Sequence, residues 1–222
     1  MKKIIKELLK TLIQKIGYRL PLFGIFLQMM IHAGYVDCNF SLWSFLKFRF
    51  FCRNRLLYHP KAKSCIVRHP KNMLIGVNSV IFKNGCYIQG GGKLVVGKYV
   101  IFATNIGVIT ANHKLTNQNE HDRGIVEIGD YCWVGMNSVI LPNVVLGPRT
   151  IVGAGSVVTK SFREGFCVIA GNPAKKIKDI NPDEFVKPKA EYEFYGWIPS
   201  DKFERFKEKH LKKNTIYFPI NI

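Results

Sequence analysis

Residues 128–157 read IGDYCWVGMNSVILPNVVLGPRTIVGAGSV, with an aliphatic residue at every sixth position. An amphipathic helix repeats about every 3.6 residues and a half-buried strand about every 2, so neither structure predicts this spacing. A hexad repeat is the signature of a parallel β-helix, in which each hexad supplies one short strand and one corner. The residues that keep the spacing are Ile128, Val134, Ile140, Leu146, Val152 and Val158.

In such a coil the aliphatic residue of each hexad points inward, and stacked coils align these residues into ladders. Three hexads close one triangular coil, and the coils stack at about the 4.8 Å spacing of paired strands. One coil cannot bury its own faces, so the pattern predicts several stacked coils with a cap at each end. Small residues are needed at the crowded corners, and glycines follow the aliphatic residues directly: Gly129, Gly135, Gly147 and Gly153.

The repeat extends upstream of this stretch. It slips around QGGGK (89–93), and the polar segment HKLTNQNEHDRG (113–124) interrupts it. We therefore predict a β-helix domain over residues 64–178 that carries an inserted loop at 113–124. The upstream positions that keep the register are Ile75, Ile81, Val96, Phe102 and Val108.

The two ends of the chain have a different composition. Residues 1–63 are basic and aromatic and are expected to form a helical appendage, and residues 179–222 form a charged tail with a short helix over 201–213 behind Ser200 as its N-cap. The apolar stretch LPLFGIFLQMMIHAG (20–34) is too short and too interrupted to predict a membrane span. In the appendage, apolar residues recur at helical spacing at Ile5, Leu8, Leu9, Leu12 and Ile16.

Charge is distributed unevenly along the chain. The 33 Lys and Arg residues exceed the 15 Asp and Glu residues, giving a formal net charge of +18. Residues 1–63 hold 12 basic and 2 acidic side chains, whereas residues 161–222 hold 12 and 9. This excess predicts an anionic partner or surface, met chiefly by the N-terminal appendage.

The cysteines and the N-terminal residues predict in which cellular compartment the protein works. Six cysteines are scattered without any C-x-x-C pair, which fits a reduced cytoplasmic protein better than a disulfide framework or a zinc site. The opening MKKIIKELLK (1–10) is basic, but its charged residues interrupt the apolar run that a signal peptide needs. We expect a cytoplasmic protein.

Two further motifs follow the hexads, VGAGSVVTK (152–160) and AGNPAK (170–175). With them, residues 74–178 resemble the left-handed β-helix acyltransferases of the hexapeptide-repeat family, the group that contains galactoside, maltose and xenobiotic acetyltransferases. The fold class that follows is mainly β, a left-handed parallel β-helix with a helical N-terminal appendage and a C-terminal helical tail. The left hand rests on the resemblance alone, because crossover connections are usually right-handed. The resemblance also implies acetyl-coenzyme A as co-substrate, and a homotrimer with active sites between subunits.

The candidate general base is His113, at the point where the coil gives way to the polar loop. Acyl transfer from a thioester to a hydroxyl needs a base that removes the hydroxyl proton. His113 resembles the catalytic histidine of the family, which also follows an A-x-N-[IV] segment (here 103–106). His121 in the same loop is the rival. Glu120, Asp122 or a backbone carbonyl could orient the imidazole.

The candidate coenzyme A residues lie after the loop. Trp133 is an unusual outward residue unless something covers it, and it resembles the family tryptophan beside the coenzyme A arm; packing against a neighbouring subunit is the alternative. Small residues leave room for an extended pantetheine arm, although corner geometry alone also explains glycines. The lysines resemble those that meet the coenzyme A phosphates, and Pro173 predicts a fixed turn before them. The remaining predicted residues are Gly135, Gly153, Ala154, Thr159, Lys160, Lys175 and Lys178.

Acceptor recognition is predicted at three asparagines, Asn84, Asn105 and Asn112, because an amide side chain both donates to and accepts from sugar hydroxyls. Asn84 lies near the position of an acceptor-binding asparagine in the family, but the register slip weakens that correspondence. The loop 113–124 is expected to shape the acceptor side of the site.

These features predict an acetyl-coenzyme-A-dependent O-acetyltransferase acting on a carbohydrate hydroxyl. The expected acceptor is a surface or capsular polysaccharide or its lipid-linked precursor, because the basic, amphipathic appendage suits peripheral contact with an anionic membrane surface. Packing of the appendage on its own trimer is the alternative. Nucleic acid is not among the expected partners.

Three other functions remain open at this point. The same fold acetylates antibiotics or the nitrogen of amino sugars. A carbonic-anhydrase-like metalloenzyme would need three imidazoles on zinc, and the coils and loop offer only His113 and His121, with His69 before them. No metal is therefore expected. A non-enzymatic β-helix subunit would not bind coenzyme A.

Overall fold

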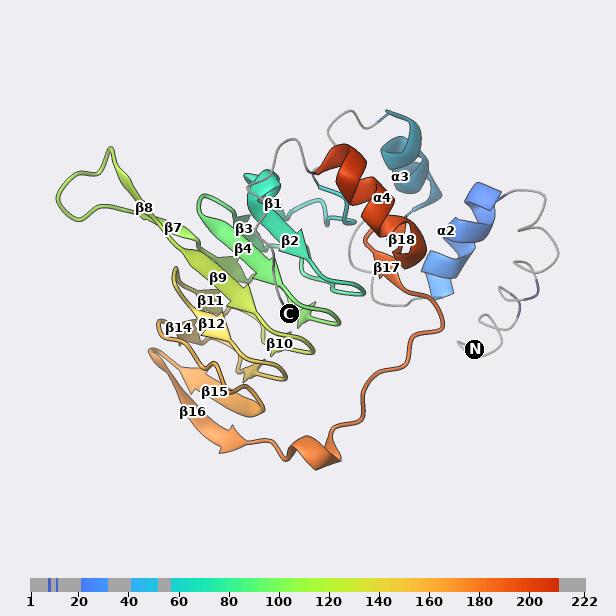
Figure 1. Cartoon of the computed structure of the whole chain (residues 1–222). Coiled ribbons are helices and arrows are strands. Elements are labelled where there is room, and N and C mark those ends of the chain that lie inside the picture. The colour runs from blue at the N-terminus through green and yellow to red at the C-terminus, as the bar shows by residue number, and fades with distance from the viewer. Residues whose placement is uncertain (1–7, 9–10, 12–20, 32–40, 52–56, 212–222) are drawn as a thin grey trace.

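The computed structural model describes residues 8, 11, 21–31, 41–51 and 57–211, and in it the hexads form a parallel β-helix (Figure 1). Three sheets make its three faces, and their strands pair in parallel except for β16, which pairs antiparallel with β15. The first face holds β1 (Ile66–Arg68), β3 (Tyr87–Gln89), β6 (Gly107–Val108), β11 (Val139–Ile140) and β14 (Val157–Val158). The second holds β5 (Ile101–Phe102), β10 (Trp133–Val134), β13 (Ile151–Val152), β15 (Cys167–Gly171) and β16 (Ala174–Asp179). The third holds β2 (Met73–Ile75), β4 (Lys93–Val96), β9 (Ile125–Ile128) and β12 (Val145–Leu146).

The sequence separation between paired strands agrees with three hexads per coil. Ile128 pairs with Leu146, 18 residues later, so three hexads make one coil. Val96 pairs with Ile128, 32 residues later, because the predicted loop lies between them. Ile75 pairs with Val96 at 21 residues, so this coil is longer than a regular one and contains the slip at 89–93. The predicted stacked-coil architecture is confirmed.

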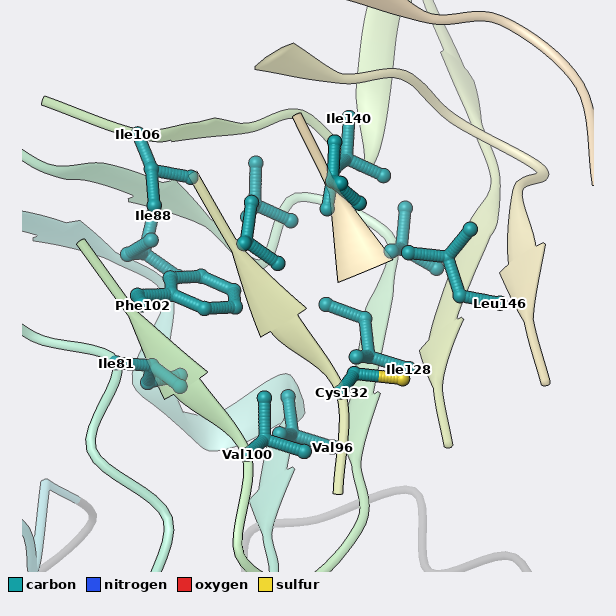
Figure 2. Packing of buried hydrophobic residues seen from close by; sticks show 14 of the residues in the cluster. Ile81, Ile88, Val96, Val100, Phe102, Ile106, Ile128, Cys132, Ile140 and Leu146 are labelled. Atoms are coloured by element: carbon teal, nitrogen blue, oxygen red, sulfur yellow. The ribbon is translucent and has the colours of Figure 1, made fainter. Parts of the chain in front are cut away.

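The hexad aliphatic residues form the core. Each of those from Val96 to Val158 is at most 2% exposed, and Figure 2 shows Phe102, Ile88 and Ile128 converging in the interior of the coil. Full burial of such a side chain contributes about 1.5–3 kcal/mol, so the ladders account for much of the folding free energy. Serine and threonine hydroxyls at the corners bond to backbone, as Thr150 Oγ1 does to the Gly147 carbonyl at 2.8 Å.

A second core joins the two ends of the chain. It contains α2 (Pro21–Ile31), α3 (Leu42–Leu46), the π-helix η2 (Lys47–Phe51), β17 (Phe194–Tyr195), β18 (Ile198–Pro199) and α4 (Ser200–His210). The Trp197 ring lies 6.1 Å from Phe45 and 6.2 Å from Phe48, measured between centroids. The Tyr58 hydroxyl reaches the backbone of Ile75 at the start of the coils. These segments, here called the cap, therefore close the N-terminal end of the β-helix.

The C-terminal segment returns along one edge of the coils to reach the cap (Figure 1). After β16, a 3-10 turn, η4 (Pro182–Glu184), precedes Phe185, whose ring lies 5.1 Å from that of Tyr131. The Asn78 side chain then accepts from the Phe194 backbone N–H at 2.9 Å. Another 3-10 turn, η3 (Pro70–Asn72), leads into β2. The tail thus contacts coils that lie far from it in sequence.

Some expectations about the ends need correction or fall outside the described residues. The predicted N-cap Ser200 is wrong: α4 begins at Ser200, Pro199 precedes it, and no side chain caps the helix. The Ser200 N–H instead bonds to the Glu193 carbonyl at 3.0 Å, because β17 and β18 hold this corner. The predicted helical face at Ile5, Leu9, Leu12 and Ile16 lies outside the described residues, as do 212–213. The boundaries 63/64 and 178/179 remain predictions.

The apolar stretch at 20–34 contributes α2, whose Phe26, Leu27 and Met29 are buried. Across the described ranges, no helix is long and apolar enough to cross a membrane. The four described cysteines, Cys65, Cys86, Cys132 and Cys167, are buried. Burial raises the pKa of the Cys132 thiol to about 12, so this thiol stays protonated and is a poor nucleophile.

Candidate active site

The predicted loop 113–124 forms a β-hairpin that leaves the coil between the first and third faces (Figure 1). Its strands are β7 (Ala111–His113) and β8 (His121–Arg123), which pair antiparallel with each other only. His113 and His121 are opposite each other, with ring centroids 4.3 Å apart. Both side chains are exposed. The predicted base and its rival are therefore neighbours on one solvent-facing element.

The imidazole of His113 is held by the tip of its own hairpin. Its Nδ1 lies 2.5 Å from the backbone carbonyl oxygen of Gln118. A carbonyl oxygen only accepts, so Nδ1 donates in this bond, and in the neutral imidazole Nε2 is then the nitrogen with the lone pair. Of the three orienting groups considered, the backbone carbonyl makes this contact. Glu120 is engaged elsewhere, with the Lys114 ammonium at 2.5 Å.

The base of the hairpin is tied to the preceding coil by Gln89. Its Oε1 accepts from the backbone N–H groups of Thr110 at 3.0 Å and Ala111 at 2.9 Å. The Thr110 hydroxyl donates to the Gln89 carbonyl at 2.8 Å and accepts from the Gly92 N–H at 2.9 Å. A Cβ on Gly92 would lie 2.0 Å from the Gly124 carbonyl oxygen, so only glycine fits there.

Sequence reasoning missed Gln89 and Thr110. A signal was present: the hexad register slips at 89–93, in the coil that stacks directly on the point where the excursion departs. The extra residues let the backbone at 90–92 approach the hairpin base, as the Gly92 contact shows. A register slip beside an insertion therefore marks residues that position the insertion.

Trp133 lies on the outer surface of the second face. Its side chain is 48% exposed, and its strand neighbours are Ile101, also 48% exposed, and the half-buried Ile151. The prediction of an outward ring is confirmed. Together these residues form an apolar stripe across three successive coils, broad enough to support an extended ligand chain.

The predicted small residues have a structural reason of their own. A Cβ on Gly135 would lie 2.6 Å from the Ala154 nitrogen, and one on Gly153 would lie 2.9 Å from the Ala170 Cβ. Close stacking of the coils therefore requires both glycines whether or not a ligand binds. Ala154 itself is exposed at the same corner, between the second and first faces.

The predicted lysines divide between two places. Lys175 and Lys178 are exposed on β16, the edge strand of the second face, so they share that face with Trp133. A cis peptide bond, Asn172–Pro173, forms the turn between β15 and β16, which confirms the expected turn. Thr159 and Lys160 are exposed after β14, at the edge between the first and third faces.

The three predicted asparagines also separate. Asn84 and Asn105 stack at the corner between the second and first faces, where the Asn105 N–H donates to the Asn84 carbonyl at 2.9 Å. Asn105 has a positive φ of 59°, a backbone state that asparagine tolerates well. Asn112 is exposed on the hairpin, opposite Asp122. Corner geometry thus explains Asn105, and the Asn84 side chain accepts from the Ser64 hydroxyl at 3.0 Å.

Within one chain, the predicted residues form two groups rather than one pocket. His113 and Asn112 lie on the hairpin at the edge between the first and third faces, and Thr159 and Lys160 lie further down that edge. The other group lies on the second face and its corner with the first: Trp133, Gly135, Gly153, Ala154, Lys175, Lys178, Asn84 and Asn105. In the described part of the chain, no three His, Cys, Asp or Glu side chains gather to hold a metal ion.

Comparisons with known proteins place this arrangement in context. Residues 125–160 match the family described as bacterial transferase hexapeptide (six repeats). A Staphylococcus aureus protein named "Putative acetyltransferase" is 34% identical over 116 residues, which are 50% of this chain and 57% of that protein. The chain thus spans little more than half the length of that relative.

Two other proteins are similar. A Lysinibacillus sphaericus protein named "Probable macrolide acetyltransferase" is 29% identical over 51% of this chain and 75% of that protein. The solved structure of galactoside acetyltransferase in complex with coenzyme A matches with a TM-score of 0.50 and 28% identity, over 57% of this chain and 66% of that one. These matches confirm the resemblance to hexapeptide-repeat acetyltransferases that the hexads indicated.

Proposed function

We propose that the protein transfers the acetyl group of acetyl-coenzyme A to a hydroxyl of a carbohydrate, with His113 as general base. The observation that carries the proposal is the bond between His113 Nδ1 and the Gln118 carbonyl, which leaves Nε2 as a proton acceptor on an exposed element. Coenzyme A would supply the acetyl group as a thioester. The acetyltransferase names of the relatives, and the bound coenzyme A of the galactoside enzyme, support this reaction.

The chemistry assigned to His113 is a single proton relay. Nε2 removes the acceptor hydroxyl proton as that oxygen attacks the thioester carbonyl carbon. The carbon–sulfur bond breaks, and the proton held by Nε2 passes to the departing thiolate. The Gln118 carbonyl stabilises the imidazolium that exists between these steps, because its oxygen bonds to the protonated Nδ1.

The second face supplies the candidate groove for coenzyme A. Trp133 and Ile101 would form an apolar wall for the pantetheine arm. Lys175 and Lys178 would meet the phosphates, because exposed ammonium groups on an edge strand can follow a flexible anionic nucleotide. These residues match the chemistry of coenzyme A, because the apolar surface for the arm and the cations for the phosphates lie one after the other on the same face.

The working enzyme in this proposal is a homotrimer. His113 lies at one edge of the triangular prism and Trp133 on another face, so one chain alone does not bring base and carrier together. Three-fold packing of parallel prisms would place the hairpin of one subunit against the second face of the next. The outer side of the first face supports such packing, because it carries Ile66, which is 49% exposed, in line with Tyr87.

Mixed trimers test the shared site. His113→Ala and Trp133→Ala are purified as separate homotrimers and as co-expressed mixtures. In random mixtures about a quarter of the interfaces pair an intact His113 with an intact Trp133 from the neighbouring subunit. Acetyl transfer in the mixture should therefore exceed that of either homotrimer. Equal rates in all three samples, or an active monomer in sedimentation, would contradict the proposal.

The acceptor is proposed to be a surface or capsular polysaccharide, or its lipid-linked precursor. The exposed Asn112 beside His113 can both donate to and accept from sugar hydroxyls. Mass spectrometry of surface glycans from the host, with and without the gene, should show the loss of an acetyl group. Unchanged glycans would refute this acceptor but leave acetyl transfer itself intact.

A macrolide hydroxyl is the second candidate acceptor, and the Lysinibacillus relative is the observation that favours it. The same base and carrier groove would serve it. Purified protein, acetyl-coenzyme A and a macrolide panel distinguish the two acceptors by release of free thiol.

A further inference from the structure

The helical segment at 42–51 has two apolar sides, of which one is buried and the other is exposed. Phe45 and Phe48 are 2% and 6% exposed and pack against Trp197 in the cap. The N-terminus of this segment is secured by Ser41, whose hydroxyl accepts from the Ser44 N–H at 3.1 Å. Phe45 and Phe48 therefore anchor this side of the segment in the interior of the cap.

The other side presents large apolar residues to solvent. Trp43 is 69% exposed, Phe50 is 61% exposed and Phe51 is 71% exposed, with Leu42 beside them at 38%. Trp43 lies in α3, and Phe50 lies in the π-helical turn that follows. Both are exposed where Phe45 and Phe48 are buried, so they lie on the side that faces away from the interior of the cap. We call the four exposed residues the aromatic patch. Exposed apolar residues gathered on one element mark an interaction surface, whereas isolated ones need no explanation.

Cations are interleaved with the aromatic patch. Lys47 lies four residues after Trp43 and four before Phe51, on the same side, and Arg49 is exposed next to Phe50. The wider sequence strengthens this positive charge: residues 38–119 contain 12 Lys and Arg and no Asp or Glu. This stretch includes α3, η2 and the first coils, so cations surround the aromatic patch, while α4 of the cap carries both signs, with Asp201, Glu204 and Glu208 beside its lysines.

We propose that the aromatic patch docks on the surface of a bilayer that contains anionic phospholipids. Trp43, Phe50 and Phe51 would enter the head-group region, where tryptophan in particular is favoured. Lys47 and Arg49 would lie among the lipid phosphates. A basic, aromatic helical segment of this kind binds in the plane of the interface and does not span the bilayer.

A lipid surface fits these residues better than a protein partner does. The centres of protein interfaces are depleted of charged residues, lysine especially, whereas Lys47 stands in the middle of the aromatic patch. Lysine and arginine side chains near an anionic membrane strengthen binding, and Lys47 and Arg49 would supply this attraction. In the proposed trimer, on which this one step depends, three-fold symmetry would turn three patches toward the same side and strengthen binding by avidity.

The test is flotation of the purified full-length protein with vesicles. Vesicles of phosphatidylglycerol and phosphatidylcholine should carry the protein upward, and pure phosphatidylcholine vesicles should carry far less. Raising the salt concentration should release it. Phe50→Ser/Phe51→Ser should weaken binding at least about tenfold, since burial of each ring contributes about 1.5–3 kcal/mol. Lys47→Glu/Arg49→Glu should remove the preference for anionic lipid. Val186→Ser, at a residue 86% exposed far along the tail, is the matched control and should bind like wild type.

A second measurement locates the contact without destabilising variants. Brominated lipids should quench part of the tryptophan fluorescence of the wild type, and Trp43→Phe should keep vesicle binding but lose that quenched part. Absence of flotation, wild-type flotation of Phe50→Ser/Phe51→Ser, or quenching that survives Trp43→Phe would each overturn the proposal. So would a change in oligomeric state caused by the patch variants, because it would place the patch between subunits. Vesicle binding needs neither coenzyme A nor an acceptor, so its failure is distinguishable from failure of the proposed acetyl transfer.

Discussion

The coils and the β7–β8 hairpin that leaves them differ in strand pairing and in the burial of their side chains. Within the coils, each strand inside a sheet pairs with a strand on either side, and the ladder residues are almost fully buried, as Val134 and Ile140 are at 0% exposure. The hairpin strands pair only with each other, and their side chains face solvent from His113 through Arg123, apart from the half-buried Lys114. The difference teaches that packing and the proposed chemistry are separated: the coils provide the buried frame, and the hairpin carries the proposed base, His113, on an exposed element.

The largest expected effect follows from that separation. His113→Ala should lower turnover by about a hundred- to ten-thousand-fold, the usual cost of losing a general base. Thermal stability and acetyl-coenzyme A affinity should stay close to wild type, because the imidazole contacts only its own hairpin. Steady-state kinetics and a thermal melt measure both quantities.

His121→Ala is the matched control for this experiment, since its ring lies on the same hairpin. It should cost far less activity than His113→Ala. If His121→Ala abolished turnover and His113→Ala did not, the base would be His121.

The reverse result is expected in the coils. Ile140→Ala should lower the free energy of unfolding by about 2–5 kcal/mol, because it leaves a cavity in a fully buried ladder. The protein that remains folded should turn over at the wild-type rate, measured well below the melting temperature. Denaturant unfolding measures the change in the free energy of unfolding. If turnover per folded molecule fell in Ile140→Ala, the coils and the hairpin would be coupled.

A smaller effect is expected where the two regions meet. Gln89→Ala leaves the N–H groups of Thr110 and Ala111 without their acceptor, at a cost of about 1–3 kcal/mol in local stability. The hairpin should then exchange its amide hydrogens faster. The kcat should fall, while the KM for acetyl-coenzyme A should stay unchanged. Gln89→Glu keeps the oxygen acceptors and should restore kcat. Equal loss in both variants would assign Gln89 a role other than positioning the hairpin.

The smallest effect concerns the junction of coils and cap, at His59. Burial lowers the pKa of His59 from 6.5 to about 3, so its imidazole is neutral in the folded protein. An unfolded chain binds this proton near pH 6.5, so the stabilisation is complete above that pH and is lost as the pH falls toward 3. The loss from this group approaches about 1.4 kcal/mol per pH unit.

Urea unfolding at pH 7, 6 and 5 would measure that slope. His59→Phe should flatten it, because phenylalanine binds no proton. An unchanged slope in His59→Phe would assign the acid sensitivity to other groups.

Sequence alone was sufficient where structure repeats locally. The hexad spacing predicted the ladders, the outward position of Trp133 and the excursion after Val108, and all three are confirmed. Each hexad meets the same environment as the one before it, so the six-residue spacing of aliphatic residues is enough to predict how the coils stack. The roles of His113 and Trp133 in catalysis remain predictions, because they depend on a family resemblance and not on the period.

Only the tertiary structure decided how distant segments meet. The period contains no information that Phe45 and Phe48 pack on Trp197, since such contacts depend on complementary shapes brought together by a returning chain. The same is true of His113, which sequence reasoning left with three possible orienting groups and which hairpin geometry joins to the Gln118 carbonyl. Repetition determines a fold because local rules suffice for it, whereas caps and sites depend on contacts that each occur once.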